Sequence, residues 1–161
     1  MALQTFSHVG VCVSDLERST RFYVDVLGFT EIFTMEMGPE LEATMEIPGS
    51  RFRTRMLGRV DVRVELLEWI EPTEVTGVGV RKPMNQLGMT HLCFRVEDID
   101  DLADVAIAAG GDVHRATLSV LEGTGVNGAP VKVMYLTDPD GTRIEFMAGA
   151  PDLARFGPQP D

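Results

Sequence analysis

Two histidines and two glutamates stand at matching positions along the chain, in the order His8, Glu65, His91 and Glu145. The histidines are 83 residues apart (91 − 8) and each opens a segment of alternating apolar residues, while the glutamates are 80 apart (145 − 65) and each lies within an apolar segment. Because an unpaired buried carboxylate is costly, a glutamate in such a segment suggests an inward face with a partner. Two imidazoles and two carboxylates converging on one cavity would bind a divalent metal ion and leave two octahedral positions for water or substrate oxygens.

Imidazole suits Zn, Ni, Co or Fe, and carboxylates extend the choice to Mn and Mg, so we predict one divalent metal ion per site without naming it. Taken singly, a histidine at a strand start is more often a polar edge residue, and a lone glutamate in a strand usually faces solvent. The matched spacing favours all four together, and we therefore predict His8, Glu65, His91 and Glu145 as the metal ligands. His114 has no counterpart in the other half, and we interpret it as a structural or surface histidine.

The matched spacing extends to the surrounding segments and indicates one module of about 80 residues used twice. At the offset of 83, Asp15 falls on Asp98 and Gly28 falls on Gly111. Each copy shows strand alternation after its histidine, then a helical stripe, then three further strand candidates, which predicts the order βαβββ. The predicted fold class is α+β, with a first module at 1–72, a linker at 73–88, a second module at 89–150 and a C-terminal tail at 151–161.

The elements of the two modules have predictable limits. In the first helix we expect Ser14 as the N-cap, Glu17 as the second member of a capping box, and Gly28 at the end. In the second helix we expect Asp98 as the N-cap and Gly110 and Gly111 at the end. The expected apolar stripes are Leu16, Tyr23, Val26 and Leu27, and then Leu102, Val105, Ala106 and Ala109. The later strands are predicted at 30–37, 52–57, 62–70, 113–120, 131–137 and 142–147, with a tight turn at 138–141 and a loop or short helix at 38–50.

The composition excludes several classes of protein. The 161 residues include 14 Lys and Arg against 25 Asp and Glu, and the resulting net charge of -11 disfavours nucleic acid, which requires a basic surface. No apolar run approaches the roughly 20 residues of a membrane helix. The first ten residues lack the pattern of a signal peptide, and we interpret Cys12 and Cys93 as reduced thiols. We therefore expect a cytoplasmic protein with no nucleic-acid or membrane partner.

The paired βαβββ modules and the order His, Glu, His, Glu resemble the vicinal oxygen chelate (VOC) superfamily. This superfamily includes glyoxalase I, methylmalonyl-CoA epimerase, extradiol dioxygenases, and fosfomycin and bleomycin resistance proteins. The matching segments extend from about residue 6 to 147 and are HVGVCVSDLERSTRFYVDVLGF, VELLEWIEP, MTHLCFRVEDIDDL and YLTDPDGTRIEF. The resemblance implies an incomplete eight-stranded barrel around a metal ion, which is chelated by vicinal oxygens of a small-molecule substrate, and we expect a homodimer. It does not by itself define the reaction.

Two members of the superfamily are compared with the chain at specific positions. Glyoxalase I usually has an Arg four residues after its first ligand and an Asn four after its second, both of which bind glutathione; here those positions are Cys12 and Trp69. The resemblance thus marks Cys12 and Trp69 as substrate-binding positions while disfavouring glutathione. Extradiol dioxygenases need two His and one Glu, and Tyr135 with the segment after it resembles their C-terminal signature. Their acid–base His is missing, because Val126–Gly128 occupy that region.

Methylmalonyl-CoA epimerase matches better, because VELLEWIEP resembles its second-ligand strand. In that chemistry a metal-held 1,3-dicarbonyl unit forms an enolate after a carboxylate removes the α-proton. We predict Glu145 as this base, with Glu65 as the second candidate. Arg51, Arg53 and Arg55 alternate along one strand face, which we interpret as a solvated basic face.

Arg95 lies four residues after His91 and corresponds to Cys12 in the other module. Strand alternation places it on the His91 face, where it could bind an anionic group of the substrate. A salt bridge to Glu97 or Asp98 is the alternative explanation. The sequence as a whole favours a metal-dependent lyase or isomerase of the glyoxalase or epimerase type, which transfers a proton α to a carbonyl. A bleomycin-resistance-type binding protein, or a ring-cleaving dioxygenase without its usual acid–base His, are the alternatives.

Overall fold

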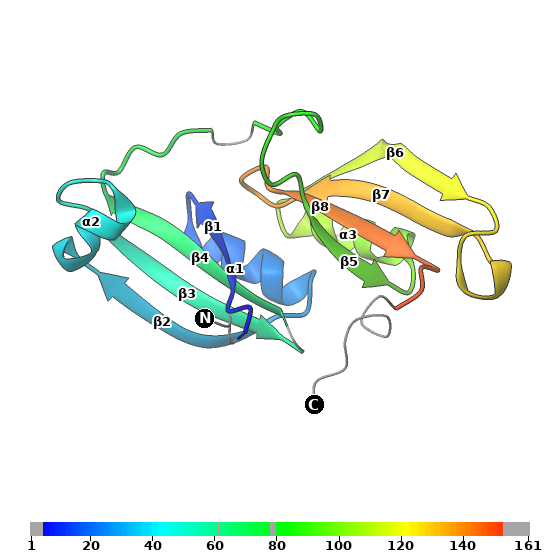
Figure 1. Cartoon of the computed structure of the whole chain (residues 1–161), viewed down its shortest axis with the longest axis horizontal. Coiled ribbons are helices and arrows are strands. Elements are labelled where there is room, and N and C mark those ends of the chain that lie inside the picture. The colour runs from blue at the N-terminus through cyan, green and yellow to red at the C-terminus, as the bar shows by residue number, and fades with distance from the viewer. Residues whose placement is uncertain (1–4, 61, 78–79, 153–161) are drawn as a thin grey trace. The chain divides into compact units, whose positions relative to one another are not determined.

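The structure is a computed structural model that describes residues 5–60, 62–77 and 80–152. Its residues divide into two compact units (Figure 1). The first unit is Met1–Val80 together with Pro139–Gly141, and the second is Arg81–Asp138 with Thr142–Asp161. The predicted module boundaries themselves stay predictions, and residues 153–161 of the predicted tail lie outside the described residues. No helix in the described ranges is long and apolar enough to cross a membrane.

The first unit contains a four-stranded mixed sheet with the order β1-β4-β3-β2. The strands are β1 (Val9–Val13), β2 (Thr30–Met37), β3 (Arg51–Arg59) and β4 (Val62–Glu71), and β1 runs parallel to β4 while the other pairs are antiparallel. Helix α1 (Leu16–Asp25) contacts β3 and β4, and the short helices η1 (Pro39–Leu41) and α2 (Glu42–Met45) occupy the segment predicted as a loop or short helix.

The second unit repeats this arrangement in the order β5-β8-β7-β6. Its elements are β5 (Leu92–Val96), α3 (Ile99–Ala108), β6 (Asp112–Leu121), the short helix η2 (Val126–Gly128), β7 (Val131–Thr137) and β8 (Arg143–Ala148). Strand β5 runs parallel to β8, and α3 contacts β6 and β8. The prediction of an α+β protein built from two βαβββ modules is therefore confirmed, and each sheet is open because its two edge strands do not pair with each other.

The core of the first unit lies between α1 and the side of the sheet that it covers. Alternate residues of a strand point to the same face, and Val64 and Leu66 of β4 are fully buried on the α1 side. They pack with Phe22 and Tyr23 of the helix, which are also fully buried. Glu65 falls between Val64 and Leu66, so its side chain points to the opposite face of the sheet. Helix α1 thus covers the face of the sheet opposite to Glu65.

The start of α1 differs from the prediction. Asp15, not Ser14, is the N-cap, and its carboxylate accepts a hydrogen bond from the Arg18 backbone N–H at 2.8 Å. Ser14 is engaged elsewhere, because its backbone N–H and its hydroxyl both donate to Asp140, at 3.0 and 2.5 Å. Because the Ser14 hydroxyl donates to the Asp140 carboxylate, Ser14 does not cap the helix, and the predicted capping box with Glu17 does not form. Gly28 ends the helix as predicted, with φ of 70°.

Helix α3 begins at its predicted cap, since the Asp98 carboxylate accepts from the Asp100 N–H at 2.7 Å. The predicted apolar stripe is partly wrong. Val105 is 40% exposed, whereas Ala103 is 1% exposed and lies in the core. The buried face of the helix follows Ile99, Ala103 and Ala106, which are spaced by four and three residues as one helical face requires.

The three arginines of β3, predicted as a solvated basic face, are solvated only in part, because Arg51 and Arg53 are 43% and 46% exposed while Arg55 is buried. They are paired with acids: Arg51 with Glu36 at 2.6 Å, and Arg53 with Glu68. The Arg55 side chain is only 10% exposed and bonds Glu17 at 2.6 Å, which raises the pKa of the guanidinium. Arg53 and Arg55 face the α1 side, because they stand opposite Glu68 and Leu66 in the sheet register. These cations therefore belong to the structural side of the first sheet.

The predicted tight turn at 138–141 forms and reaches the first unit. The Asp138 N–H donates to the carbonyl oxygen of Thr142 at 3.0 Å, and Gly141 adopts φ of 90°. Asp140 of this turn accepts hydrogen bonds from Ser14 and from Arg18, the latter at 2.7 Å. Residues Pro139–Gly141 consequently belong to the first unit although the strands on either side belong to the second.

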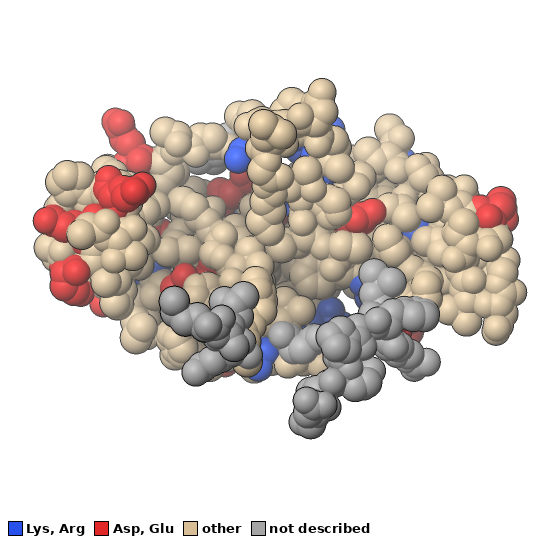
Figure 2. All heavy atoms as spheres, viewed as in Figure 1, with Lys and Arg blue, Asp and Glu red and all other residues tan. Residues whose placement is uncertain are grey.

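Acidic side chains dominate the surface at one end of the first unit. Figure 2 shows them gathered over the end that carries η1 and α2, where Glu40, Glu42 and Glu46 are all exposed. This distribution agrees with the net charge of -11.

Candidate metal and substrate site

In the first unit, His8 and Glu65 come together as a pair. The Nε2 atom of His8 lies 3.3 Å from Oε2 of Glu65. The other ring nitrogen of His8, Nδ1, is 2.9 Å from the hydroxyl of Ser7. The second carboxylate oxygen of Glu65 accepts a hydrogen bond from Thr54 at 2.6 Å. Strand register explains the pairing, because Glu65 of β4 stands opposite Gly10 of β1, two residues after His8.

In the second unit, His91 and Glu145 form the same arrangement. The Nε2 atom of His91 lies 2.8 Å from Oε2 of Glu145, and its Nδ1 is 2.9 Å from the hydroxyl of Thr90. Glu145 of β8 stands opposite Cys93 of β5, two residues after His91. Burial, together with a hydrogen bond to the Glu145 carboxylate, raises the pKa of the Cys93 thiol to about 12, so the thiol is protonated at neutral pH.

Each histidine is therefore held at Nδ1 by the hydroxyl of the residue before it and directs Nε2 at a glutamate. This is a favourable arrangement for metal ligation, in which the ring nitrogen away from the metal is fixed by a hydrogen-bond partner. Each unit contributes one nitrogen and one oxygen donor, a set that suits Zn, Ni, Co, Fe or Mn. Within the described part of either unit, no three His, Cys, Asp or Glu side chains gather as a metal site. A four-ligand site thus stays a prediction, and the donors present fit it.

The four side chains differ in exposure. The side chains of His8 and Glu65 are 36% and 21% exposed, whereas those of His91 and Glu145 are 25% and 11% exposed. Glu145 is consequently the drier of the two carboxylates. Both pairs remain open enough for solvent or a ligand to reach them.

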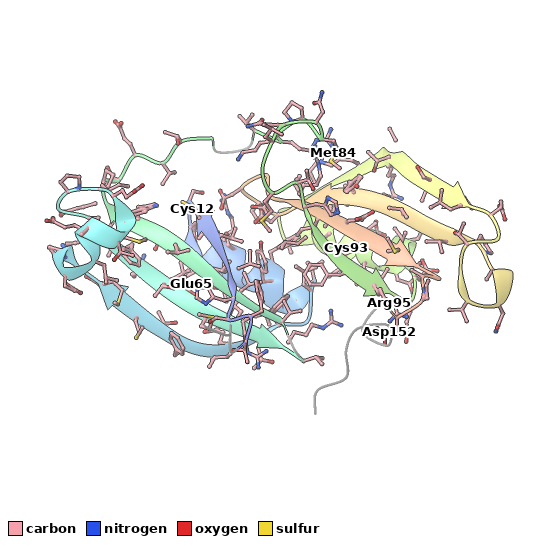
Figure 3. The ribbon with its side chains drawn as sticks, in the orientation of Figure 1. Cys12, Glu65, Met84, Cys93, Arg95 and Asp152 are labelled. Carbon is pink, nitrogen blue, oxygen red and sulfur yellow. The ribbon has the colours of Figure 1, made fainter. Side chains whose placement is uncertain are left out.

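Cys12 and Trp69 share the Glu65 face of the first sheet. Cys12 stands opposite Leu67, and Leu67 and Trp69 follow Glu65 at alternate positions of β4. The Trp69 ring lies against Phe52, with the centroids 5.4 Å apart. Burial raises the pKa of the Cys12 thiol, although a hydrogen bond with Trp69 opposes this, and the thiol is uncharged at neutral pH. Figure 3 shows Cys12 and Glu65 in the first unit.

Arg95 has a partner that the sequence did not suggest. Its Nε donates to the carbonyl oxygen of Ala150 at 3.1 Å, and its Nη1 lies 3.4 Å from Asp152, as the labelled side chains in Figure 3 show. The expected alternative, a bridge to Glu97 or Asp98, is replaced by this contact with the segment after β8. The Arg95 side chain is still 48% exposed, so it retains donors for a further anionic group.

Two further residues lie in the sheet row of Glu145, His114 and Tyr135. One row across the second sheet runs His114, Tyr135, Glu145 and Cys93, each opposite the next. The Tyr135 ring packs edge-on against the His91 ring with the centroids 5.5 Å apart, and Arg143 lies over the Tyr135 ring at 5.6 Å. Burial raises the pKa of Tyr135, and the nearby Glu145 carboxylate adds to this.

His114 had been interpreted as a structural or surface residue. Its side chain is only 19% exposed, and burial lowers its pKa. Its Nε2 is buried and has no hydrogen-bond partner among the described residues. The turn at 138–141 is the signal that could have revealed the row, because it sets Thr137 opposite Arg143 and hence Tyr135 opposite Glu145.

Comparisons with known proteins agree with this geometry. The family model described as the glyoxalase/bleomycin resistance protein/dioxygenase superfamily matches residues 5–146. A lactoylglutathione lyase from Haemophilus influenzae is 31% identical over 141 residues, which cover 87% of this chain and 89% of that protein.

Two solved structures share the fold. A glyoxalase family protein from Bacillus cereus superposes with a TM-score of 0.78 at 18% identity and covers 94% of this chain and 97% of its own. A fosfomycin resistance protein from Listeria monocytogenes, solved with Mn(II) and sulfate, gives a TM-score of 0.58 at 16% identity and covers 92% and 95%.

Proposed function

Because the chain belongs to the glyoxalase/bleomycin resistance protein/dioxygenase superfamily, we propose that it is a metal-dependent enzyme of the lyase or isomerase type. Its reaction would move a proton at the carbon next to a carbonyl group, in a small substrate that chelates the metal through neighbouring oxygens. The observation that carries the proposal is the repeated pair: a histidine fixed at Nδ1 by a hydroxyl, with Nε2 directed at a glutamate, once in each unit.

His8, Glu65, His91 and Glu145 would hold the metal ion. A bound divalent cation would supply Lewis acidity that offsets negative charge on the substrate oxygens. Ser7 and Thr90 keep the two imidazoles in the orientation in which Nε2 is the donating atom. The orienting role of each hydroxyl rests on a hydrogen bond within its own unit.

Glu145 is the better candidate for the base that accepts the substrate proton. One oxygen of Glu65 is already engaged, because it accepts a hydrogen bond of 2.6 Å from the Thr54 hydroxyl. Glu145 instead accepts from the Cys93 thiol, which is a weak donor. The Glu145 side chain is also less exposed, at 11% against 21% for Glu65, which excludes competing water from the proton transfer. After rearrangement the same group returns the proton to the neighbouring carbon.

The relatives named lactoylglutathione lyase favour the glyoxalase type of reaction over the epimerase type. The substrate, however, need not carry glutathione, because neither Cys12 nor Trp69 offers a charged group for a peptide. We therefore propose a glyoxalase-type proton transfer on a different oxygen-chelating substrate.

The test combines metal analysis with proton exchange. Protein purified without chelator should hold about one divalent ion per pair of modules, the stoichiometry of a four-ligand site. In D₂O, α-ketoaldehyde adducts of a panel of small thiols should rearrange with deuterium incorporation detectable by NMR. Glu145→Gln should abolish this rearrangement, while Arg115→Gln, at an exposed position of β6, serves as the matched control. Full metal retention in His8→Ala, or unchanged turnover in Glu145→Gln, would contradict the proposal.

A further inference from the structure

The first sheet carries an apolar face around Glu65. Residues that stand opposite one another in a sheet, and alternate residues along a strand, share one face. Three rows cross this face: Phe33, Met56 and Glu65, then Met35, Thr54, Leu67 and Cys12, and then Met37, Phe52 and Trp69. We call the seven residues Phe33, Met35, Met37, Phe52, Met56, Leu67 and Trp69 the apolar face.

Part of the apolar face is accessible, chiefly on β2, whereas Phe52 of β3 is only 2% exposed. Phe33 is 42% exposed and Met35 is 46% exposed, although both lie in the middle of β2. Contiguous exposed apolar surface on a protein of this size is typical of a binding site. Methionine is suited to such a surface, because its unbranched, polarisable side chain adapts to ligands of different shape.

The apolar face has almost no charge. The β3 arginines Arg53 and Arg55 point to the opposite side, where acids neutralise them. Cys12 is an uncharged thiol, since burial raises its pKa. Arg63 shares the Glu65 face but lies on the far side of Glu65 from Leu67, and its guanidinium donates to the Val60 and Val62 carbonyl oxygens of its own hairpin.

The position of the apolar face indicates its occupant. It is continuous with the His8–Glu65 pair, because Phe33 and Met56 stand in the same row as Glu65. Leu67 and Trp69 follow two and four residues later along β4, about 7 and 13 Å away at the rise of a β-strand. A ligand whose oxygens reach Glu65 would therefore extend its remaining part over Met35, Leu67 and Trp69.

We propose that the substrate carries an apolar group, an aryl group or an alkyl chain of about five to ten carbons, which the apolar face binds while its oxygen-bearing end reaches the His8–Glu65 pair. This inference rests on the proposed function and adds the substrate class to it. It also gives a physical reason for uncharged residues at positions 12 and 69, because a charged side chain there would lose its hydration under an apolar ligand.

The experiment uses straight-chain hydroxamates, which present two adjacent oxygens to a metal and differ in the length of the alkyl group. Acetohydroxamate through octanohydroxamate are titrated into the metal-loaded protein by calorimetry. Trp69 is the single tryptophan of the chain, so its fluorescence reports occupancy of the apolar face directly. Affinity should rise about three- to fourfold for each added methylene, the factor that corresponds to about 0.8 kcal/mol per buried CH₂. The longer hydroxamates should also change the Trp69 emission.

Substitutions on the apolar face test whether it binds the alkyl group of the hydroxamate. Met35→Gln and Leu67→Gln keep the side-chain size and should flatten the dependence on chain length, while acetohydroxamate binding stays unchanged. Val120→Gln in β6 replaces an equally exposed aliphatic residue, 48% exposed in the second unit, and should behave as wild type. The wild-type chain-length series needs no variant, so a folding defect in Met35→Gln would not remove the test.

The outcomes separate the two proposals. If hydroxamates of all lengths bind the metal-loaded protein with equal affinity, the apolar substrate is wrong while the proposed function stands. If no hydroxamate binds and no metal is retained, the proposed function itself fails. If Met35→Gln lowers the sedimentation coefficient and leaves the chain-length dependence intact, the apolar face is a contact between copies of the chain, and the inference is overturned.

Discussion

The hydroxyl groups of Ser7 and Thr90 should contribute directly to metal affinity. Each lies 2.9 Å from Nδ1 of the histidine that follows it. When Nε2 binds a cation, Nδ1 carries the proton and donates to this hydroxyl, which fixes the ring orientation. The perturbation is Thr90→Val, which keeps the branched shape of the side chain and removes only the hydroxyl, together with Ser7→Ala.

The size of the effect follows from the surroundings of each ring. A neutral hydrogen bond is worth about 0.5–1.5 kcal/mol, or roughly two- to thirteenfold in affinity. The His91 side chain is 25% exposed and that of His8 is 36% exposed, so water replaces the lost hydroxyl less well at His91. We expect Thr90→Val to weaken metal binding about tenfold and Ser7→Ala about threefold. The double variant should show close to the product of the two effects, because the hydroxyls have no partner in common.

The assay is competition for the metal against a chromophoric chelator at fixed pH. Thr124→Val is the matched control, since it also removes a threonine hydroxyl, one that donates to the Leu121 carbonyl in an exposed loop. Metal affinities of Thr90→Val and Ser7→Ala within twofold of this control would refute the reasoning. They would show that the histidine rings are oriented by packing alone or that neither ring binds the metal.

Three further changes test other parts of the structure. Asp140→Asn should destabilise the protein by about 1–3 kcal/mol in urea unfolding, because the carboxylate accepts charge-assisted hydrogen bonds. Burial alone would raise the pKa of Asp140, but the hydrogen bonds from Ser14 outweigh this and lower it. Its contribution is therefore present above the ordinary aspartate pKa and lost as the pH falls through the lower folded value, so the variant should lose less stability in acid than wild type. The Cys93 thiol, with a pKa of about 12, should react with iodoacetamide at pH 8 about 1,000-fold more slowly than free cysteine, as followed by peptide mass spectrometry; rapid labelling would contradict its protection. Arg95→Ala should raise the KM of an anionic substrate about tenfold or more if the guanidinium binds it, whereas an unchanged KM would leave Arg95 with only its contact to Asp152.

Much of the fold could be predicted because the chain repeats. His8 and His91 set the two copies in register, and the order βαβββ then follows from alternation and helical stripes. The errors lie where a distant residue decides the local structure. Ser14 is a good N-cap by type, yet its hydroxyl bonds Asp140, which is 126 residues away. Arg55 alternates like a surface residue but is enclosed by the acid Glu17 of the neighbouring helix.

The site was predictable to the extent that its residues have counterparts in the other module. His8, Glu65, His91 and Glu145 were found by symmetry, and their pairing within each unit is observed. Tyr135 and His114 have no such counterparts, and it is the register of β6, β7 and β8 that places them in the row of Glu145.

The two modules differ in the residues beside their matched His–Glu pairs. At the offset of 83 residues, Gly10 corresponds to Cys93 and Cys12 to Arg95, so the second module has a thiol where the first has a glycine, and a cation where the first has a thiol. In the sheet register, Met56 stands opposite Glu65, whereas Tyr135 stands opposite Glu145. The repeat therefore explains why the donors of the two pairs match, but it does not explain their neighbours, which each module sets through its own strand sequence.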